Sequence, residues 1–216
     1  MAMLRNMTLS AVLLGLFAIA GTGMVAYIFD HTKQRIAANE RASVLRNLHQ
    51  LVPPQMHDND LFKDIIHVVD PQLLGTKEAV VVYRARRANK PATAILTAIA
   101  PDGYTGEIKL LVAINYDGTL AGVRVVLHRE TPGLGDRIEL ERSNWILGFN
   151  NRSLTNPEKN KWHVKRDGGV FDQLTGATIT PRAVVKAVRN TLIYFDKHRD
   201  TLFTTPAIQS DQENIP

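Results

Sequence analysis

The residues best suited to chemistry lie in one stretch, DQLTGATIT, at residues 172–180. It places Thr175, Thr178 and Thr180 around a Gly-Ala step, directly before the helical pattern PRAVVKAVRNTLIYFDKH. Thr180 suits the N-cap of that helix, because Pro181 follows it at the first helical position. Thr178 is then left near the unpaired N–H groups of the helix, where a phosphate can bind. The alternative is that Thr178 is an ordinary turn residue.

A second stretch, ETPGLG at residues 130–135, favours close approach of a ligand. Gly133 and Gly135 follow a proline, and such an open backbone lets a planar ligand or a phosphate come near. It is not a dinucleotide-binding fingerprint, because Ile138 stands where a third glycine belongs. Taken alone, the segment is typical of a loop that ends a strand.

The elements that must position these loops follow from the hydrophobic pattern. Strands are expected at 79–87 and 93–101, and Asp117-Gly118 predicts a type I′ hairpin between strands Glu107–Tyr116 and Thr119–Arg129. Helices are expected at 37–53, at 137–149 and after Thr180, and a further strand at 161–166. In the last helix, Val184, Val188, Leu192 and Phe195 form an inward stripe, while Lys186, Arg189 and Lys197 face water. The fold class is therefore α+β, with an antiparallel sheet and packed helices.

The N-terminal region carries an uncharged apolar run from Met7 to Phe29. At about 1.5 Å per residue this run can cross a hydrocarbon core of roughly 30 Å, which predicts a single transmembrane helix. A buried core helix is one alternative. A signal peptide cleaved after Ala18–Ala20 is another, although the apolar run continues well past that point. Basic residues lie on both sides of the span, so charge leaves the orientation open.

Composition excludes several classes of function. The chain has 216 residues and no cysteine, so disulfides, iron–sulfur ligation and thiol catalysis are absent. The seven histidines lack the spacing of metal ligands, and no Gly-x-Ser-x-Gly elbow occurs, so neither a protein metal site nor a catalytic residue is predicted. The net charge of +5 is modest, and a membrane span argues against a nucleic-acid partner.

Taken together, three segments carry a family resemblance: GYTGEI at 103–108, HRETPGLG at 128–135 and DQLTGAT at 172–178. The chain resembles the FMN-binding domain of flavinylated membrane subunits, over nearly its whole length. This family includes subunits of the Rnf/Rsx ion-translocating electron transport complex and of the sodium-pumping NADH:quinone reductase. The resemblance implies an electron-carrying flavoprotein subunit of a membrane complex, not a catalyst on its own.

The resemblance also implies roles for individual residues. Thr178 carries FMN through a phosphoester bond, within a sequence that a separate flavin transferase reads. The flavin ring stays free for redox work, and the loop at 130–135 supplies candidate contacts to it. The cofactor-binding residues expected beside Thr178 are Asp172, Thr175, Gly176, Ala177, Glu130, Thr131, Gly133 and Gly135.

The expected organisation has four parts. Residues 1–30 form the anchor, 31–75 a helical connecting region, 76–203 the FMN-binding domain and 204–216 a mobile tail. By resemblance, the domain lies on the periplasmic side of the inner membrane and its partners are membrane and iron–sulfur subunits. Two alternatives stay open: the C-type subunit of the sodium-pumping quinone reductase, and a membrane-anchored ligand-binding domain without redox function.

Overall fold

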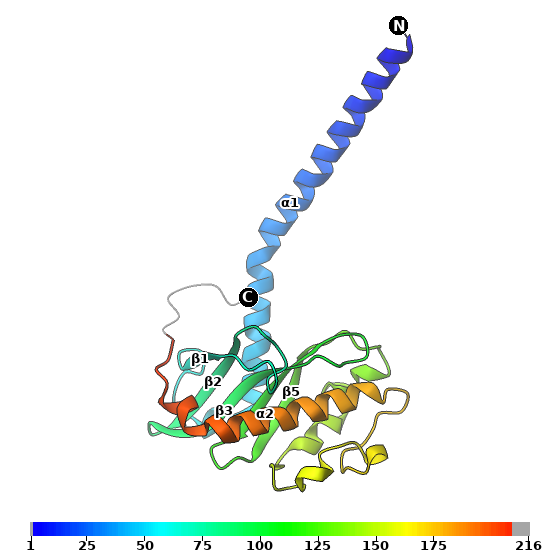
Figure 1. The fold of residues 1–216 in the computed structure, drawn as a ribbon. Helices are drawn as coiled ribbons and strands as arrows, with labels where there is room; N and C mark the ends of the chain where they lie inside the picture. The colour runs from blue at the N-terminus through cyan, green and yellow to red at the C-terminus, as the bar shows by residue number, and fades with distance from the viewer. Residues whose placement is uncertain (1, 209–216) are drawn as a thin grey trace. The chain divides into compact units, whose positions relative to one another are not determined.

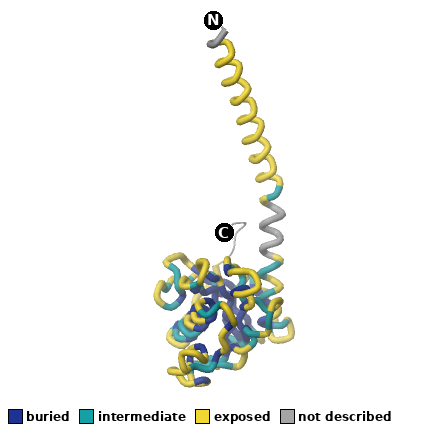
Figure 2. The backbone as a smooth tube through the Cα atoms, turned by 90° about the vertical axis from the view of Figure 1, so that its right-hand side faces the viewer, coloured by how far each residue is buried: buried dark blue, intermediate teal, exposed yellow. Residues whose placement is uncertain are grey.

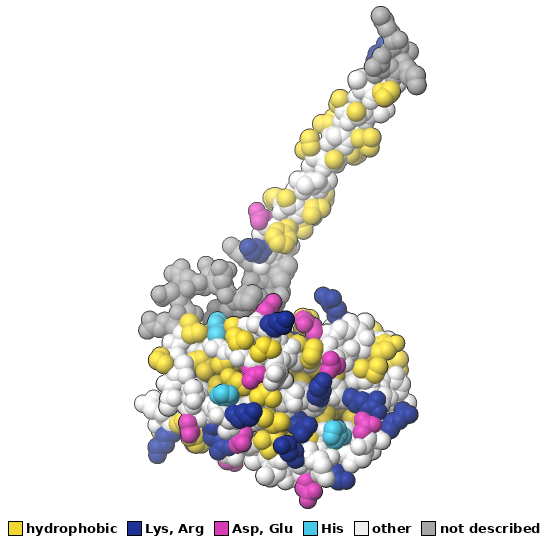
Figure 3. All heavy atoms as spheres, in the orientation of Figure 1, with side chains coloured by type: hydrophobic (Ala, Val, Ile, Leu, Met, Phe, Trp, Pro, Cys, Tyr) yellow, Lys and Arg dark blue, Asp and Glu magenta, His cyan; other side chains and the backbone are white. Residues whose placement is uncertain are grey.

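The computed structural model describes residues 2–208, except for the side chains of residues 2–4 and 34–41. It forms two compact units, Met1–Arg46 and Asn47–Pro216. The first unit consists of the helix α1 (Ala2–Leu51) up to the unit boundary. Within α1, the segment Arg5–Lys33 is long and apolar enough to cross a membrane, with a mean hydropathy of 2.1. It is the one such helical segment among the described residues. None of that apolar window is buried (Figures 2 and 3).

The second unit is built on a five-stranded antiparallel sheet in the order β1-β2-β3-β4-β5 (Figure 1). The strands are β1 (Ile65–Val68), β2 (Val80–Arg87), β3 (Lys90–Ala100), β4 (Ile108–Asn115) and β5 (Leu120–Leu127). Each strand pairs with the next one along the chain, so the sheet is a simple meander. The predicted α+β class and antiparallel sheet are confirmed.

The two faces of the sheet are covered by different helices. The helix α2 (Ile179–Thr204) packs on β3 and β4, and its predicted inward residues Val184, Val188, Leu192 and Phe195 are all buried. On the opposite face, the last turn of α1 lies against β5. A Cβ on Gly122 would come within 3.0 Å of Leu51 Cδ2, so the absence of a side chain lets the helix approach the strand.

The type I′ turn predicted at Asp117-Gly118 is wrong. Only Gly118 has a positive φ, of 91°, whereas a type I′ turn needs positive values at both central residues. The carboxylate of Asp117 instead accepts hydrogen bonds from Thr119 N and Oγ1, which hold a longer loop between Asn115 and Thr119. The bond from the Thr119 hydroxyl lowers the pKa of Asp117. Two successive positive values occur at Ala88 and Asn89, between β2 and β3.

Three further expectations fail because tertiary contacts override the local pattern. Residues 65–68 form β1 inside the stretch expected to be a helical connecting region. The helix expected at 137–149 is two short 3-10 helices, η2 (Gly135–Ile138) and η3 (Asn144–Phe149), because Ser143 is extended and caps η3. The strand expected at 161–166 has only an isolated bridge, between Val164 and Phe171.

An aromatic cluster explains the misleading pattern at 161–166. Trp162 and Val164 are buried, which gives the alternation of a strand. Trp162 lies 5.0 Å from the ring of Phe171 and 6.4 Å from that of Phe149, centroid to centroid. The alternation therefore reflects insertion into the core without strand pairing.

The C-terminal end of α2 is tied to the sheet. Arg84 donates to the carbonyl oxygens of Leu202 and Thr205, and Arg86 donates to that of Phe203. Beyond the helix, Ile208 N donates to Ile65 O at 2.9 Å, on the outer edge of β1. The rest of the tail expected at 204–216, from residue 209, lies outside the described residues.

Candidate functional site

The helix α2 begins two residues before the predicted start. Thr178, with helical φ and ψ of −83° and −29°, is the N-cap and Ile179 the first helical residue. The prediction that Thr180 caps the helix is therefore wrong. Thr180 is fully buried, and its hydroxyl donates to the carboxylate of Glu130, a partner 50 residues upstream. Pro181 falls at the third helical position, where its missing N–H costs no hydrogen bond within the helix.

Thr178 stands at this helix start with its hydroxyl unused for capping. The side chain is half-buried, and the first turn of α2 contains no acidic residue. A helix of 26 residues presents unpaired N–H groups and a partial positive charge at this end. Thr178 therefore offers an alcohol beside a favourable environment for an anion.

The turn before Thr178 depends on Gly176. Ala177 N donates to Leu174 O across the turn, and Gly176 has a φ of 82°, which disfavours any other residue. Thr175, in the same turn, is exposed. The two predicted loops meet here: a Cβ on Gly176 would come within 2.9 Å of Leu134 Cδ2.

Glu130 joins the segments at 103–108 and 128–135 to the first turn of α2. Only 4% of the residue is exposed, and its two oxygens accept separate hydrogen bonds. Thr105 N donates to Oε1 at 3.0 Å, and Thr180 Oγ1 donates to Oε2. Glu130 N in turn donates to His128 Nδ1 at 3.0 Å. Both oxygens of the buried Glu130 are therefore bonded within the protein. This geometry favours a role in holding the loop and the helix start together over direct contact with a ligand.

The rest of the 130–135 loop is closed on itself. The carbonyl of Thr131 accepts from the backbone N–H groups of Leu134 and Gly135, at 3.2 and 3.0 Å. Gly133 has a φ of 78°, and Gly135 packs against Glu130. Both glycines thus have structural reasons to be present. Leu134 is exposed beside Gly176, and Thr131 is exposed in the same loop, so both remain available to a ligand.

Asp172 lies at the surface ahead of this turn. Its carboxylate forms an ion pair with Lys165 at 2.5 Å, and its carbonyl oxygen accepts from Trp145 Nε1 at 2.6 Å. The indole bond fixes the backbone of the segment, while the carboxylate stays largely exposed. Asp172 is therefore placed where another protein can read it.

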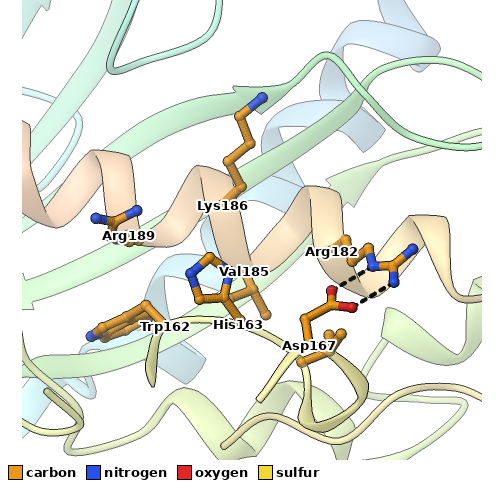
Figure 4. A pocket seen from close by; sticks show the side chains of 8 residues that line it. Trp162, His163, Asp167, Arg182, Val185, Lys186 and Arg189 are labelled. Carbon is orange, nitrogen blue, oxygen red and sulfur yellow. Dashed lines mark hydrogen bonds and ion pairs between the residues drawn. The ribbon is translucent and has the colours of Figure 1, made fainter. Parts of the chain in front are cut away.

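A cavity of about 190 Å³ lies along α2 beyond Thr178 (Figure 4). Arg182, Val185, Lys186 and Arg189 line it from the helix. Two of these cations are already paired: Arg182 donates two hydrogen bonds to Asp167, both at 2.6 Å, and Lys186 forms an ion pair with Asp102. The bonds from Arg182 lower the pKa of Asp167. Arg182 follows Thr178 by four residues, but its guanidinium is already neutralised by the carboxylate of Asp167.

Comparison with known proteins identifies the fold and the chain's relatives. A model of the FMN-binding domain matches residues 103–193, which include every segment described above. A second model, of the RnfG N-terminal region, matches residues 1–51. The G subunit of the ion-translocating oxidoreductase complex of Shewanella loihica is 46% identical over 205 residues, covering 95% of this chain and 97% of that protein. The chain belongs to this family of G subunits.

Other G subunits of this complex agree. That of Pseudomonas aeruginosa is 49% identical over 198 residues, with 92% of both chains covered. That of Aliivibrio fischeri is 44% identical over 204 residues, with 94% and 97% covered. The predicted FMN-binding domain and relation to the Rnf/Rsx complex are confirmed. The relatives are named as G subunits, so they favour this assignment over the C-type subunit of the quinone reductase.

Sequence reasoning missed two members of the site. Thr105 and Thr180 reach the carboxylate of Glu130 from segments far apart in the chain. For Thr105 there is a signal, because GYTGEI is one of the three segments that carry the resemblance. Nothing in that segment indicates that Thr105 bonds to Glu130. For Thr180 the local signal favours capping, and that signal is misleading.

Proposed function

We propose that this chain is a membrane-anchored electron-carrying subunit that holds FMN covalently, through a phosphoester bond to Thr178. The observation that carries the proposal is the hydroxyl of Thr178, which makes no capping hydrogen bond. It lies at the N-terminus of a long helix, inside an FMN-binding domain. The bound flavin supplies the redox chemistry, accepting one or two electrons. The protein supplies the attachment point and the surroundings.

The residues present fit a phosphate ester at Thr178. The ester needs an accessible alcohol, and Thr178 is half-buried with its hydroxyl free of the capping bond. The negative charge of the phosphate is offset by the partial positive charge and the unpaired N–H groups of the helix N-terminus. Leu134 lies exposed next to the Gly176 turn, and it and the exposed Thr131 of the same loop are the candidates to contact the flavin ring.

The attachment requires a second protein. We propose that a flavin transferase recognises the surface around Asp172, Thr175, Gly176 and Ala177, where the carboxylate and the Thr175 hydroxyl are exposed. The remaining partners are membrane and iron–sulfur subunits of the same complex, in keeping with the names of the relatives as parts of a complex.

Protein purified from a flavinylating host should be heavier than its sequence mass by roughly 440 Da, the mass of FMN less one water. The same protein should give a fluorescent band on a denaturing gel, because a phosphoester survives unfolding. Intact-mass spectrometry measures the first and in-gel fluorescence the second. A sequence mass from that host, with no fluorescent band, would support the non-redox alternative and overturn the proposal.

The helix at Arg5–Lys33 should anchor the chain in the inner membrane, with the second unit on the periplasmic side. Alkaline carbonate washing is expected to leave the protein in the membrane pellet, since about 20 apolar residues suffice for a stable span. Protease added to spheroplasts should digest the domain, as followed by immunoblot. Release of a shortened chain by carbonate would indicate a signal peptide, and protection from protease would place the domain in the cytoplasm.

A further inference from the structure

The carboxylate of Glu130 occupies a cradle that two glycines leave open. A Cβ on Gly103 would lie 2.9 Å from Glu130 Oε1, and a Cβ on Gly135 would lie 2.8 Å from the Cβ of Glu130 and 2.9 Å from Oε2. Such distances are closer than real Cβ atoms approach their neighbours, so a side chain at Gly135 would displace Glu130. A side chain at Gly103 would meet the carboxylate as well as the carbonyl oxygen of Gly106. The two motif loops are therefore shaped around this one buried group.

The carboxylate is held by hydrogen bonds alone. Burying a charged group is costly unless its oxygens are satisfied, and in the described part of the chain no lysine or arginine forms an ion pair with Glu130. Its partners are a backbone amide, from Thr105, and a hydroxyl, from Thr180. The nearby helix N-terminus adds a favourable partial positive charge. Loss of either donor removes a large part of what keeps the group in place.

This buried group fixes the start of α2. Thr180 is the second residue of the helix and has no exposed surface. Its hydroxyl anchors the first turn to the 130–135 loop, and Thr178 precedes it by two residues on the same turn. The hydrogen bond from Glu130 N to His128 Nδ1, with His128 Nε2 bonded to Glu139, ties the other side of the loop. The position of the Thr178 hydroxyl therefore depends on the bond between Thr180 and Glu130.

We infer that Glu130 is a positioning residue, which acts through Thr180 to hold the Thr178 hydroxyl where the flavin transferase can use it. The inference rests on the proposed attachment of FMN to Thr178. In this inference Glu130 does not contact the flavin. Its buried carboxylate, which accepts from Thr105 and Thr180, instead supports the helix start that carries Thr178.

Thr180→Val tests the inference, because it removes only the hydroxyl and keeps the shape of a fully buried side chain. Each variant is expressed as the full chain in the same host, and the flavin transferase is expressed in a limited pulse. Intact-mass spectrometry of the folded protein then gives the flavinylated fraction over time. The rate for Thr180→Val should fall by about tenfold to a hundredfold, since small misplacements of a reacting group have effects of this size. Thr180→Ser, which restores the hydroxyl, should recover most of the rate.

Thr191→Val is the matched control. Thr191 is another fully buried threonine of α2, whose hydroxyl donates to Ala187 O at 2.8 Å, well away from Thr178. Its replacement should lower stability about as much and leave the flavinylation rate unchanged. Glu130→Met, which removes both acceptor oxygens, should behave like Thr180→Val, with thermal unfolding measured in parallel. Normal flavinylation of folded Thr180→Val would overturn the inference, whereas unflavinylated wild type in that host would overturn the proposed function instead.

Discussion

Thr178→Ala should abolish covalent flavin completely while the protein still folds. No other threonine of the segment can replace it: Thr180 is buried and bonded to Glu130, and Thr175 lies on the far side of the Gly176 turn, away from the helix start. The Thr178 hydroxyl makes no capping bond, so its loss should cost no more than about 1 kcal/mol of folding free energy. The measurements are intact mass and in-gel fluorescence of protein from a flavinylating host.

Two variants control this result. Thr178→Ser keeps an alcohol at the same position and should keep the flavin, although a primary alcohol differs in reactivity. Thr175→Ala leaves the attachment hydroxyl untouched, so a covalent flavin should still be found, in an amount that reports on recognition by the transferase. If Thr178→Ala retained a covalent flavin, the attachment would have to lie elsewhere in the chain.

Asp64→Asn should lower the free energy of unfolding by about 3–5 kcal/mol, the usual effect of removing one partner of a buried ion pair. Asp64 pairs with Arg84, whose side chain is 1% exposed, and with Arg86 at 2.6 Å. Burial lowers the pKa of Arg84, and the Asp64 carboxylate opposes that effect. With asparagine, the amide N–H₂ replaces an acceptor and leaves a buried guanidinium without its counter-charge.

The measurement is denaturant unfolding of the full chain in detergent, followed by tryptophan fluorescence. Both tryptophans, Trp145 and Trp162, lie in the second unit, so the signal reports on the sheet domain alone. Asp60→Asn is the control, because Asp60 forms an exposed ion pair with Lys63 at 4.0 Å, and asparagine keeps the Oδ1 that accepts from Phe62 N. Such pairs contribute about 0–1 kcal/mol. Equal destabilisation by the two variants would show that the ion pairs of Asp64 with Arg84 and Arg86 contribute no more to stability than an exposed pair does.

The strands and the inward face of α2 were predictable because each depends on a local pattern. The run at 79–87 and the hairpin strands are rich in β-branched residues, and the stripe from Val184 to Phe195 has helical spacing. Those signals predict which side chains are buried. They do not predict which turn joins two strands: the positive φ values fall at Ala88 and Asn89, where Ala88 N donates to Asp58 Oδ2, a residue 30 positions away.

The attachment segment was predictable for a different reason, and only in part. Its residue types indicate an anion site at a helix start, and the resemblance indicates which threonine. The helix start itself could not be placed correctly, because the partner that withdraws Thr180 from capping is Glu130, distant in sequence. Periodicity carries no information about such long-range hydrogen bonds. The roles of Thr105 and of the glycines around Glu130 are therefore visible only in three dimensions.

The hydrogen bond from Ile208 to Ile65 has a consequence for the order in which the domain can fold as the chain emerges. The strand β1 is made early, and an uncovered strand edge is a template for pairing with other chains. The backbone that contacts this edge at Ile65 follows α2, so it is translated after all five strands. Until that segment is made, the outer edge of β1 lacks this contact and is more open to pairing with other chains.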